Sequence, residues 1–334
     1  MRILQVSSPI QLGGGETHVL ELTAELRKRG HDVVLAGRPG GAVKPEIELP
    51  FRNALDLGTV LGLRRLIKRE RFDVIHAHVA RDYPLVAAAV WGLPGKLVFT
   101  RHLLYPVKAQ FLYRRVDGWI APTSQILKTL APLKPRTSAA IPNWVDLDRF
   151  PFKPHAPHTP LNLGLLGQIS PHKGHDDAVA AMRDLPEGYR LLIAGQGEPK
   201  YVEALKKKAL GFPVGFVGFV SLPEFFAKID ILAVPSWEEP FGIVLLEAMA
   251  SGIPVIATDR GGPLDIIPSA LHGVLIPPRD PSALAAAIRS LASNGPRRSA
   301  IVRNAREHVE KNFDIRSVAP RVEDFYRRLI LAAR

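Results

Sequence analysis

The sequence predicts an α/β protein with two doubly wound, Rossmann-like domains, and three observations support this prediction. The chain has 334 residues, a length that fits two domains of about 150 residues each. In both halves, short β-rich runs alternate with helical patterns, which is typical of parallel sheets covered by helices on both faces. Between the halves, residues 150–160 hold four prolines and no periodicity, as an interdomain linker does.

The N-terminal half supplies five expected strands. A turn at Gly13-Gly14-Gly15 separates the first two, and an amphipathic helix over 16–29 follows it and ends at the C-cap glycine Gly30. The expected strands cover residues 3–8, 32–37, 72–78, 96–100 and 118–122.

The C-terminal half repeats this alternation. Its expected strands cover residues 161–167, 190–195, 214–218, 230–235 and 253–258. A capping-box pattern from Ser221 to Glu224 starts a helix, and the tail from about residue 281 is helical. We therefore expect domains over 1–150 and 151–315, and a last helix over 316–334 that crosses back to the first domain. Ligands of such folds bind at the carboxyl ends of the strands, so the loops that follow strands should carry the function.

Composition narrows the possible functions. The chain has no cysteine, which excludes disulfides, thiolate metal sites and a cysteine nucleophile. Neither a signal peptide nor an apolar run of about 18 residues is evident, so we expect a cytoplasmic protein. Residues 1–150 hold 22 Lys and Arg against 13 Asp and Glu, a net charge of +9, while the rest carries +3. This asymmetry indicates an anionic partner or, alternatively, only contributes solubility.

The strongest motif is PSWEEPFGIVLLEAMASG at 235–252, directly after an expected strand. Gly242 opens a helix, and the backbone N–H groups at its start, at Ile243 and Val244, suit a phosphate. Glu247, over a turn beyond the helix start, can bind a pair of ribose hydroxyls, as an acidic residue does in dinucleotide folds. Glu239, just before the helix, can accept hydrogen bonds from sugar hydroxyls.

Over nearly its whole length, the chain resembles the retaining glycosyltransferases of family 4, the group 1 class. Glu239 to Glu247 match the E-x7-E element of that family. Further matching segments lie at 13–33, 141–146, 165–175 and 261–267. The resemblance implies the GT-B fold, in which two Rossmann-like domains face each other across a cleft, with the acceptor bound by the first and the donor by the second.

In the resembled family, an Arg and a Lys hold the donor diphosphate, and the matching positions here are Gln168 and Lys173. Lys173 can balance the charge of a leaving diphosphate, whereas Gln168 departs from the family pattern and carries no charge. The resemblance also places Gly15 near the diphosphate and His102 near the reacting sugar carbon. Val220, after the strand over 214–218, is expected to meet the nucleotide base. Lys173 and His102 could instead be a solvated loop lysine and a structural histidine.

We expect no metal in the transfer reaction. Asp146-Leu147-Asp148 matches D-x-D superficially, but it lies before the linker, so we interpret it as structural. His76 and His78 alternate on one strand and share a face, yet the sequence offers them no evident third ligand. We therefore expect a core or cleft-edge role for both histidines.

The predicted function is transfer of a glycosyl group from a nucleotide sugar to an acceptor with retention of anomeric configuration, in glycolipid, lipopolysaccharide or other cell-envelope glycan synthesis. A GT-B sugar-nucleotide epimerase and a non-catalytic nucleotide-sugar binding protein stay open. A nicotinamide dehydrogenase is disfavoured, because His18 stands where a dinucleotide fingerprint needs a small residue.

Two basic stretches could bind an anionic membrane surface at the inner face of the cell membrane. In the first, Leu63, Leu66 and Ile67 form an apolar stripe surrounded by cations, and the second runs from Tyr105 to Arg115. The cations of the first stretch are Arg64, Arg65, Lys68, Arg69 and Arg71. Alternatively, both stripes are core faces of helices that cover the sheet. A nucleic-acid partner is not expected, because no known binding module is present.

Overall fold

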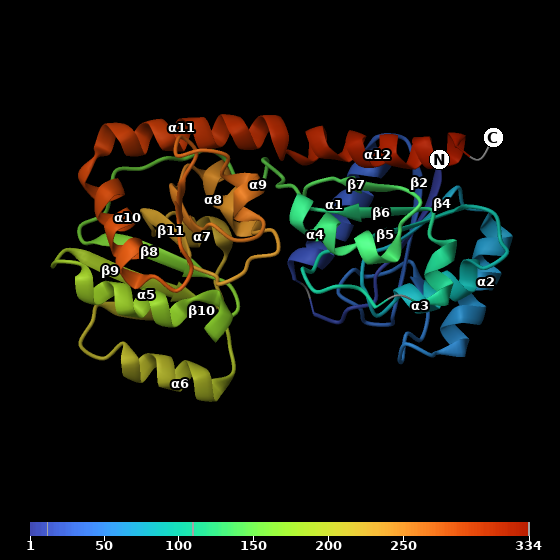
Figure 1. Cartoon of the computed structure of the whole chain (residues 1–334), viewed down its shortest axis with the longest axis horizontal. Coiled ribbons are helices and arrows are strands. Elements are labelled where there is room, and N and C mark those ends of the chain that lie inside the picture. Colours follow the sequence, from blue (N-terminus) through green and yellow to red (C-terminus); the bar gives the residue numbers. More distant parts are fainter. Residues whose placement is uncertain (12, 109, 333–334) are drawn as a thin grey trace. The chain divides into compact units, whose positions relative to one another are not determined.

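The computed structural model describes residues 1–11, 13–108 and 110–332, which form two compact units (Figure 1). Unit 1 comprises Met1–Trp144 and Ile315–Arg334, and unit 2 comprises Val145–Asp314. The first boundary lies six residues before the predicted one. Val145, Leu147 and Phe150 are buried in a core cluster of unit 2, so the chain enters that unit before the proline-rich segment begins.

Unit 1 is built on a parallel sheet of seven strands in the order β3-β2-β1-β4-β5-β6-β7. The order reverses between β1 and β4, which makes this the topological switch point. The strands are β1 (Arg2–Val6), β2 (Asp32–Gly37), β3 (Ile47–Glu48), β4 (Val74–Ala77), β5 (Lys96–Thr100), β6 (Gly118–Ala121) and β7 (Ser138–Ala140).

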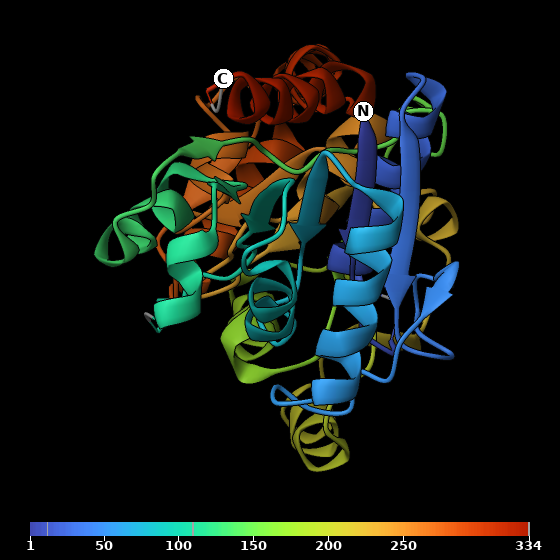
Figure 2. The same ribbon diagram turned by 90° about the vertical axis from the view of Figure 1, so that its right-hand side faces the viewer.

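Helices cover both faces of this sheet, as the sequence predicted (Figure 2). One face packs on α1 (Gly14–Lys28) and α12 (Ile315–Leu331), and the other on α2 (Leu57–Glu70) and α3 (Tyr83–Val90). Shorter turns are α4 (Ser124–Thr129), η1 (Phe111–Arg115) and η2 (Ala131–Leu133). Helix α1 begins two residues earlier than predicted, because Glu16 accepts a hydrogen bond from the Gly13 backbone at 3.0 Å and caps it there.

Unit 2 is built on a parallel sheet of six strands in the order β10-β9-β8-β11-β12-β13, with its switch point between β8 and β11. The two sheets therefore confirm the predicted pair of doubly wound α/β domains. The strands are β8 (Leu161–Leu166), β9 (Tyr189–Ala194), β10 (Val214–Gly218), β11 (Ile231–Val234), β12 (Val255–Thr258) and β13 (Val274–Ile276).

The helices of unit 2 also lie on two faces. One buried cluster joins the sheet to α5 (His175–Ala181), α6 (Pro199–Lys208) and α10 (Pro281–Ser293). The other joins it to α7 (Leu222–Phe226), α8 (Ile243–Ser251), α9 (Pro263–Ile266) and α11 (Gly295–Asn312). Short turns η3 (Pro171–Lys173) and η4 (Met182–Asp184) flank α5.

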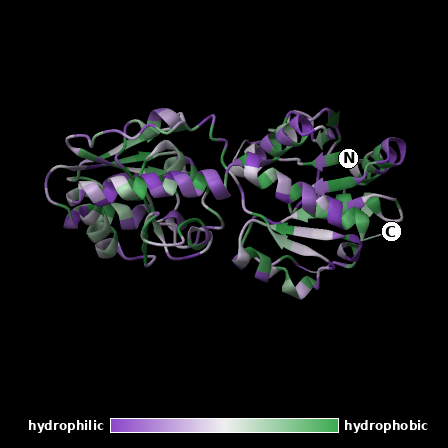
Figure 3. Ribbon diagram, turned by 90° about the horizontal axis from the view of Figure 1, so that it is seen from above, coloured by the Kyte–Doolittle hydropathy of each residue, from purple (hydrophilic) through white to green (hydrophobic). Residues whose placement is uncertain are grey.

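The last helix, α12, belongs to unit 1 although it follows unit 2 in the chain. Hydrophobic residues recur among hydrophilic ones along this helix (Figure 3), as expected of a helix with one buried side. Phe325 covers Gly118 so closely that a Cβ there would lie 2.7 Å from the ring. Among the described residues, no helix is long and apolar enough to cross a membrane.

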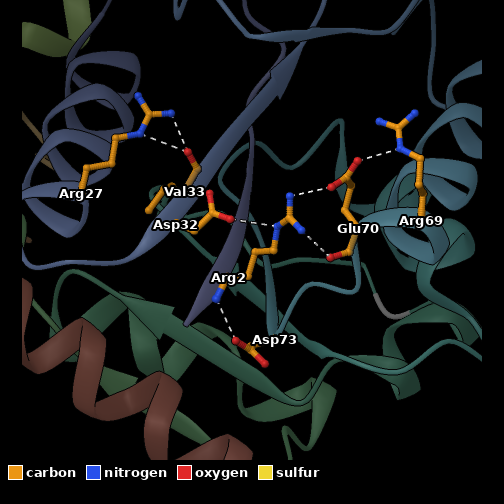
Figure 4. A network of polar contacts seen from close by, with 7 residues as sticks. All are labelled: Arg2, Arg27, Asp32, Val33, Arg69, Glu70 and Asp73. Carbon is orange, nitrogen blue, oxygen red and sulfur yellow. Dashed lines mark hydrogen bonds and ion pairs between the residues drawn. The ribbon is translucent and has the colours of Figure 1, made fainter.

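A polar network fixes the amino ends of three strands in unit 1 (Figure 4). The Arg2 guanidinium lies 3.0 Å from a carboxylate oxygen of Asp32 and 2.5 Å from one of Glu70. The backbone N–H of Arg2 donates to Asp73 at 2.7 Å, and Arg69 donates to Glu70 at the same distance. These contacts lie at the edge opposite the carboxyl ends of the strands, so they serve the fold.

Candidate functional site

Two loops meet at the switch point of the unit 2 sheet, where ligands bind in folds of this type. Lys173 ends the loop after β8, and Glu239 lies in the loop after β11. Nζ of Lys173 donates to Oε2 of Glu239 at 2.7 Å, and the Glu239 side chain is only 10% exposed. The structure thus brings two predicted site residues from distant segments into direct contact.

Glu239 is fixed by further contacts that the sequence did not predict. The Ser236 hydroxyl donates to its carboxylate at 3.0 Å, and the Gly262 N–H donates to its backbone carbonyl at 2.8 Å. Gly261 has a φ of +76°, and a Cβ there would lie 2.0 Å from the Glu239 carbonyl oxygen. Only glycine permits this close approach of the loops after β11 and β12, which holds Glu239 in place.

Helix α8 begins directly after this loop. Gly242 is its N-cap with a φ of +96°, and the first backbone N–H groups of a helix have no partner within it. Ile243 and Val244 are half-buried at this start, where the helix dipole favours an anion. Glu247 is half-buried and lies further along α8.

The other donor residues predicted in unit 2 lie in neighbouring loops. Gln168 is exposed in the same loop as Lys173, after β8. Val220 follows β10 and packs partly buried against a core cluster of unit 2. The loops after β8 and β9 also touch closely, since a Cβ on Gly195 would lie 1.8 Å from the Gly167 carbonyl oxygen. All the predicted donor residues of unit 2 therefore lie at or beyond the carboxyl ends of its strands.

Trp237 and Arg279 also border this edge, and neither was expected from the sequence. The Trp237 indole N–H donates to Asp177 of α5 at 2.8 Å, and the Arg279 guanidinium lies 4.1 Å from the Trp237 ring centroid. Arg279 follows β13, far from Trp237 in the chain. Because β13 has only three residues, no strand was expected there, and no signal connected the two residues.

In unit 1, Gly15 lies in the first turn of α1, with open space where a Cβ would be, and His102 follows β5. His102 lies in a cluster with His18, His76 and His78, in which the rings of His76 and His78 are 4.0 Å apart. Burial holds the pKa of His18, His76 and His78 well below the usual value. Burial, assisted by the Arg101 cation, lowers the pKa of His102 to about 4. The four imidazoles are therefore neutral near pH 7.

His76 has partners for both ring nitrogens. Nδ1 lies 2.5 Å from the Tyr326 hydroxyl of α12, and Nε2 lies 2.7 Å from the Thr100 hydroxyl. This confirms a core position for His76, whereas His78 faces His102 and His18. Asp146 accepts a hydrogen bond from the Asp148 N–H at 3.0 Å, which closes a local turn.

A cavity of about 340 Å³ lies in unit 2 near the amino ends of β11 and β12, and no predicted donor residue lines it. His155 and Asp230 lie in its wall. The His158 imidazole donates to Asp230 at 2.9 Å, and Asn162 donates its N–H to the same carboxylate at 2.7 Å. These contacts fasten the proline-rich segment to the sheet, so we assign them a structural role.

The prediction that the apolar stripe of α2 faces a membrane is wrong. Leu63, Leu66 and Ile67 are buried in the core of unit 1, so this face was a sheet-covering face instead. Of the surrounding cations, Arg64 donates to the Trp91 carbonyl at 2.6 Å and is half-buried, while Arg65, Lys68, Arg69 and Arg71 are exposed.

Comparisons with known proteins cover nearly the whole chain. Residues 146–308 match the family described as "Glycosyl transferases group 1", and residues 12–149 match "Glycosyltransferase Family 4". Glycogen synthase of Mycobacterium tuberculosis is 30% identical over 98% of this chain and 94% of its own. D-inositol 3-phosphate glycosyltransferase of Xylanimonas cellulosilytica is 28% identical, over 88% of this chain and 87% of that protein. The solved structure of Anabaena HepE with UDP-glucose is 22% identical, covers 98% of this chain and all of its own, and has a TM-score of 0.84.

Proposed function

The chain belongs to the group 1, family 4 glycosyltransferases, and from this premise we propose that it transfers a glycosyl group from a nucleotide sugar to an acceptor with retention of anomeric configuration. The expected GT-B fold is confirmed by its two Rossmann-like units and its structural relatives. The observation that carries the proposal is the contact of Lys173 with Glu239 at the switch point, next to the start of α8.

Each part of a nucleotide sugar has a matching partner at this edge of unit 2. Lys173 and the first backbone N–H groups of α8, at Ile243 and Val244, offer positive charge to a diphosphate. Glu239 is an acceptor for sugar hydroxyls, and its backbone is immobilised by Gly261 and Gly262. Glu247, further along the same helix, is the acceptor for the ribose hydroxyls.

In the proposed reaction, the acceptor hydroxyl attacks the anomeric carbon from the face that the diphosphate leaves. The new C–O bond forms as the bond to the phosphate oxygen breaks, and the departing diphosphate takes the proton of the acceptor. The protein positions the partners and stabilises the charge that develops on the diphosphate through Lys173 and α8. His102 in unit 1, as a neutral imidazole, would hydrogen-bond a hydroxyl of the reacting sugar.

Because Lys173 and the α8 N-terminus can stabilise the leaving group, we propose that the transfer needs no metal. Transfer activity should then survive an excess of EDTA. Full loss of activity that magnesium or manganese restores would contradict this, and it would direct attention to Asp146 and Asp148.

Thermal unfolding with a panel of nucleotide sugars tests donor binding without knowledge of the acceptor. A ligand present at 100 times its Kd stabilises a protein by about 2.7 kcal/mol, so the true donor should raise the unfolding temperature. The rise should disappear in Glu239→Gln and persist in Glu238→Gln, which changes the exposed neighbour. Equal shifts in both variants would contradict the proposed site.

We further propose that the acceptor is lipid-linked and that unit 1 binds the anionic surface of the membrane that carries it. Trp91 and Phe111 stack with their ring centroids 5.2 Å apart, and the Arg114 guanidinium lies 5.1 Å from the Phe111 centroid. Phe111 is 64% exposed. The exposed cations Arg65 and Lys68 lie on α2, the helix that bonds to Trp91 through Arg64. Aromatic residues beside exposed cations suit an anionic lipid interface.

Vesicle co-sedimentation tests this surface. Arg65→Glu with Lys68→Glu should remove binding to anionic vesicles, because each cation contributes about 1 kcal/mol near such a surface. These two positions are chosen because Arg64 and Arg69 make internal contacts with Trp91 and Glu70. The control, Lys206→Glu with Lys207→Glu, reverses two exposed charges on α6 of unit 2 and should leave binding unchanged. Equal binding to neutral and anionic vesicles would contradict the proposal and favour a soluble acceptor.

A further inference from the structure

Three histidines of unit 1 each keep one buried ring nitrogen that has no hydrogen-bond partner among the described residues. These atoms are Nδ1 of His18, Nδ1 of His78 and Nε2 of His102. The three side chains come from α1, from the end of β4 and from the end of β5. One nitrogen of each lies within 4.8 Å of those of the other two. A buried polar atom without a partner is costly, so three at one place indicate a missing ligand.

We propose that His18, His78 and His102 bind one divalent transition-metal ion of the class that prefers imidazole, such as Zn²⁺, Co²⁺ or Ni²⁺. A neutral imidazole donates the lone pair of its unprotonated nitrogen to such an ion. Three histidines with an open fourth position for water form a complete ligand set for tetrahedral zinc. No further ligand for His78 was evident from the sequence; in the structure, His18 and His102 come from two other segments of the chain.

Neighbouring residues set the protonated nitrogen of His78 and the orientation of His18. Nε2 of His78 lies 2.6 Å from Oε1 of Gln5. An amide oxygen only accepts, so Nε2 carries the proton and Nδ1 keeps its lone pair. His18 stacks on Trp144 with their ring centroids 3.8 Å apart, and the Trp144 indole donates to Glu21 at 3.0 Å.

The geometry requires only a modest movement of the rings. Zinc lies 2.0–2.1 Å from an imidazole nitrogen, so tetrahedral coordination needs nitrogens about 3.3 Å apart. From a limit of 4.8 Å, the rings must approach by up to about 1.5 Å. His102, which is half-buried in the loop after β5, can supply this movement by side-chain rotation.

Metal binding would also have a consequence for transfer, and this consequence rests on the proposed function. An ion on Nε2 of His102 would remove the lone pair that hydrogen-bonds the reacting sugar. The site would therefore inhibit transfer when it is filled. Inhibition by a bound ion is compatible with a transfer reaction that itself needs no metal. A chelator would remove the inhibitory ion and leave transfer active.

Titration of the metal-free protein with Co²⁺, without donor, tests binding directly. We expect about one equivalent per chain and the visible absorption of four-coordinate cobalt. His102→Gln and His78→Gln should each weaken binding at least tenfold. The thermal unfolding temperature of each variant checks that it folds. As a milder change, Gln5→Met keeps all three ligands but removes the acceptor for His78. It should weaken binding about tenfold, and by less than the loss of either ligand does.

A second set of possible ligands, His155, His158 and Asp230 in unit 2, provides the control. His155→Ala should leave the cobalt absorption and the stoichiometry unchanged. The proposal is overturned if one equivalent of Co²⁺ gives no absorption change, if His102→Gln binds as tightly as the wild type, or if His155→Ala abolishes binding.

The inhibitory consequence has its own measurement. Zn²⁺ at one equivalent should inhibit donor turnover by the wild type, and EDTA should restore it. Unchanged turnover with zinc bound would refute inhibition. Absence of turnover under every condition would refute the proposed function, whereas the cobalt titration would still decide the metal site.

Discussion

At the scale of single residues, the contacts of the proposed donor site converge on Glu239. Its carboxylate accepts hydrogen bonds from Lys173 and Ser236, and its carbonyl accepts one from Gly262. A buried carboxylate with this many donors is held in one orientation before any sugar arrives. Lys173 is more exposed than Glu239, and its ammonium group has further N–H donors that can bind a phosphate.

Glu247 is the residue whose role is simplest to test by substitution. If it binds the ribose, Glu247→Ala removes a charge-assisted hydrogen bond of about 1.5–3 kcal/mol. Donor affinity, measured by calorimetry, should fall about ten- to a hundredfold. The exposed Glu238→Ala serves as the matched control and should bind normally. Unaltered nucleotide affinity in Glu247→Ala would refute the assignment.

Gln168 offers a test in the opposite direction. It is exposed in the loop of Lys173, where the resembled family has an arginine. Gln168→Arg adds a guanidinium that can bind phosphate in a bidentate manner, so donor affinity should rise by up to about tenfold. Gln196→Arg adds the same charge in the exposed loop after β9 and should have a smaller effect. An equal gain in both variants would show only a general effect of charge.

At the scale of elements, glycines allow the loops of unit 2 to pack backbone against backbone. Gly261→Ala would combine an unfavourable φ with a Cβ placed 2.0 Å from the Glu239 carbonyl oxygen. We expect it to lower the free energy of unfolding by about 2–5 kcal/mol in denaturant titrations, and to weaken donor binding. Gly188→Ala has a similar φ of +95° but open space, so it should cost only about 1–2 kcal/mol. Equal losses would contradict the role of close packing.

The elements also show how far sequence can reach. Both sheets, the helix before Gly30 and the helix after Gly242 were predicted, because each has a strong apolar pattern and a clear glycine signal. Strands β3, β7 and β13 were missed, because they have only two or three residues each.

Side-chain contacts over long chain distances were beyond the reach of pattern analysis. The contact of Ser236 with Glu239 is local, yet only the folded loop reveals it. The histidine cluster joins positions 18, 78 and 102. His102 was expected to be a site residue and His78 was considered as a possible metal ligand, but no pattern connected either of them to His18. His18 was noted because it breaks a dinucleotide fingerprint, and the structure places it beside His102 instead.

At the scale of the whole molecule, the chain leaves unit 1 after Trp144 and returns to it at Ile315. Helix α12 buries Val318, Phe325 and Tyr326 against the unit 1 sheet, and Tyr326 contacts His76. Unit 1 is therefore complete only with the last segment of the chain. The histidine cluster of unit 1 is thereby connected to a helix that follows all of unit 2.

The most direct test of the central claim follows the anomeric configuration of the product. The nucleotide sugar that stabilises the protein most is incubated with it in EDTA, with water or a supplied acceptor, and the anomeric proton is followed by NMR. A retaining transferase should give a first-formed product with the configuration of the donor, before any mutarotation. An inverted product, or conversion of the donor into an epimer without transfer, would contradict the proposed function.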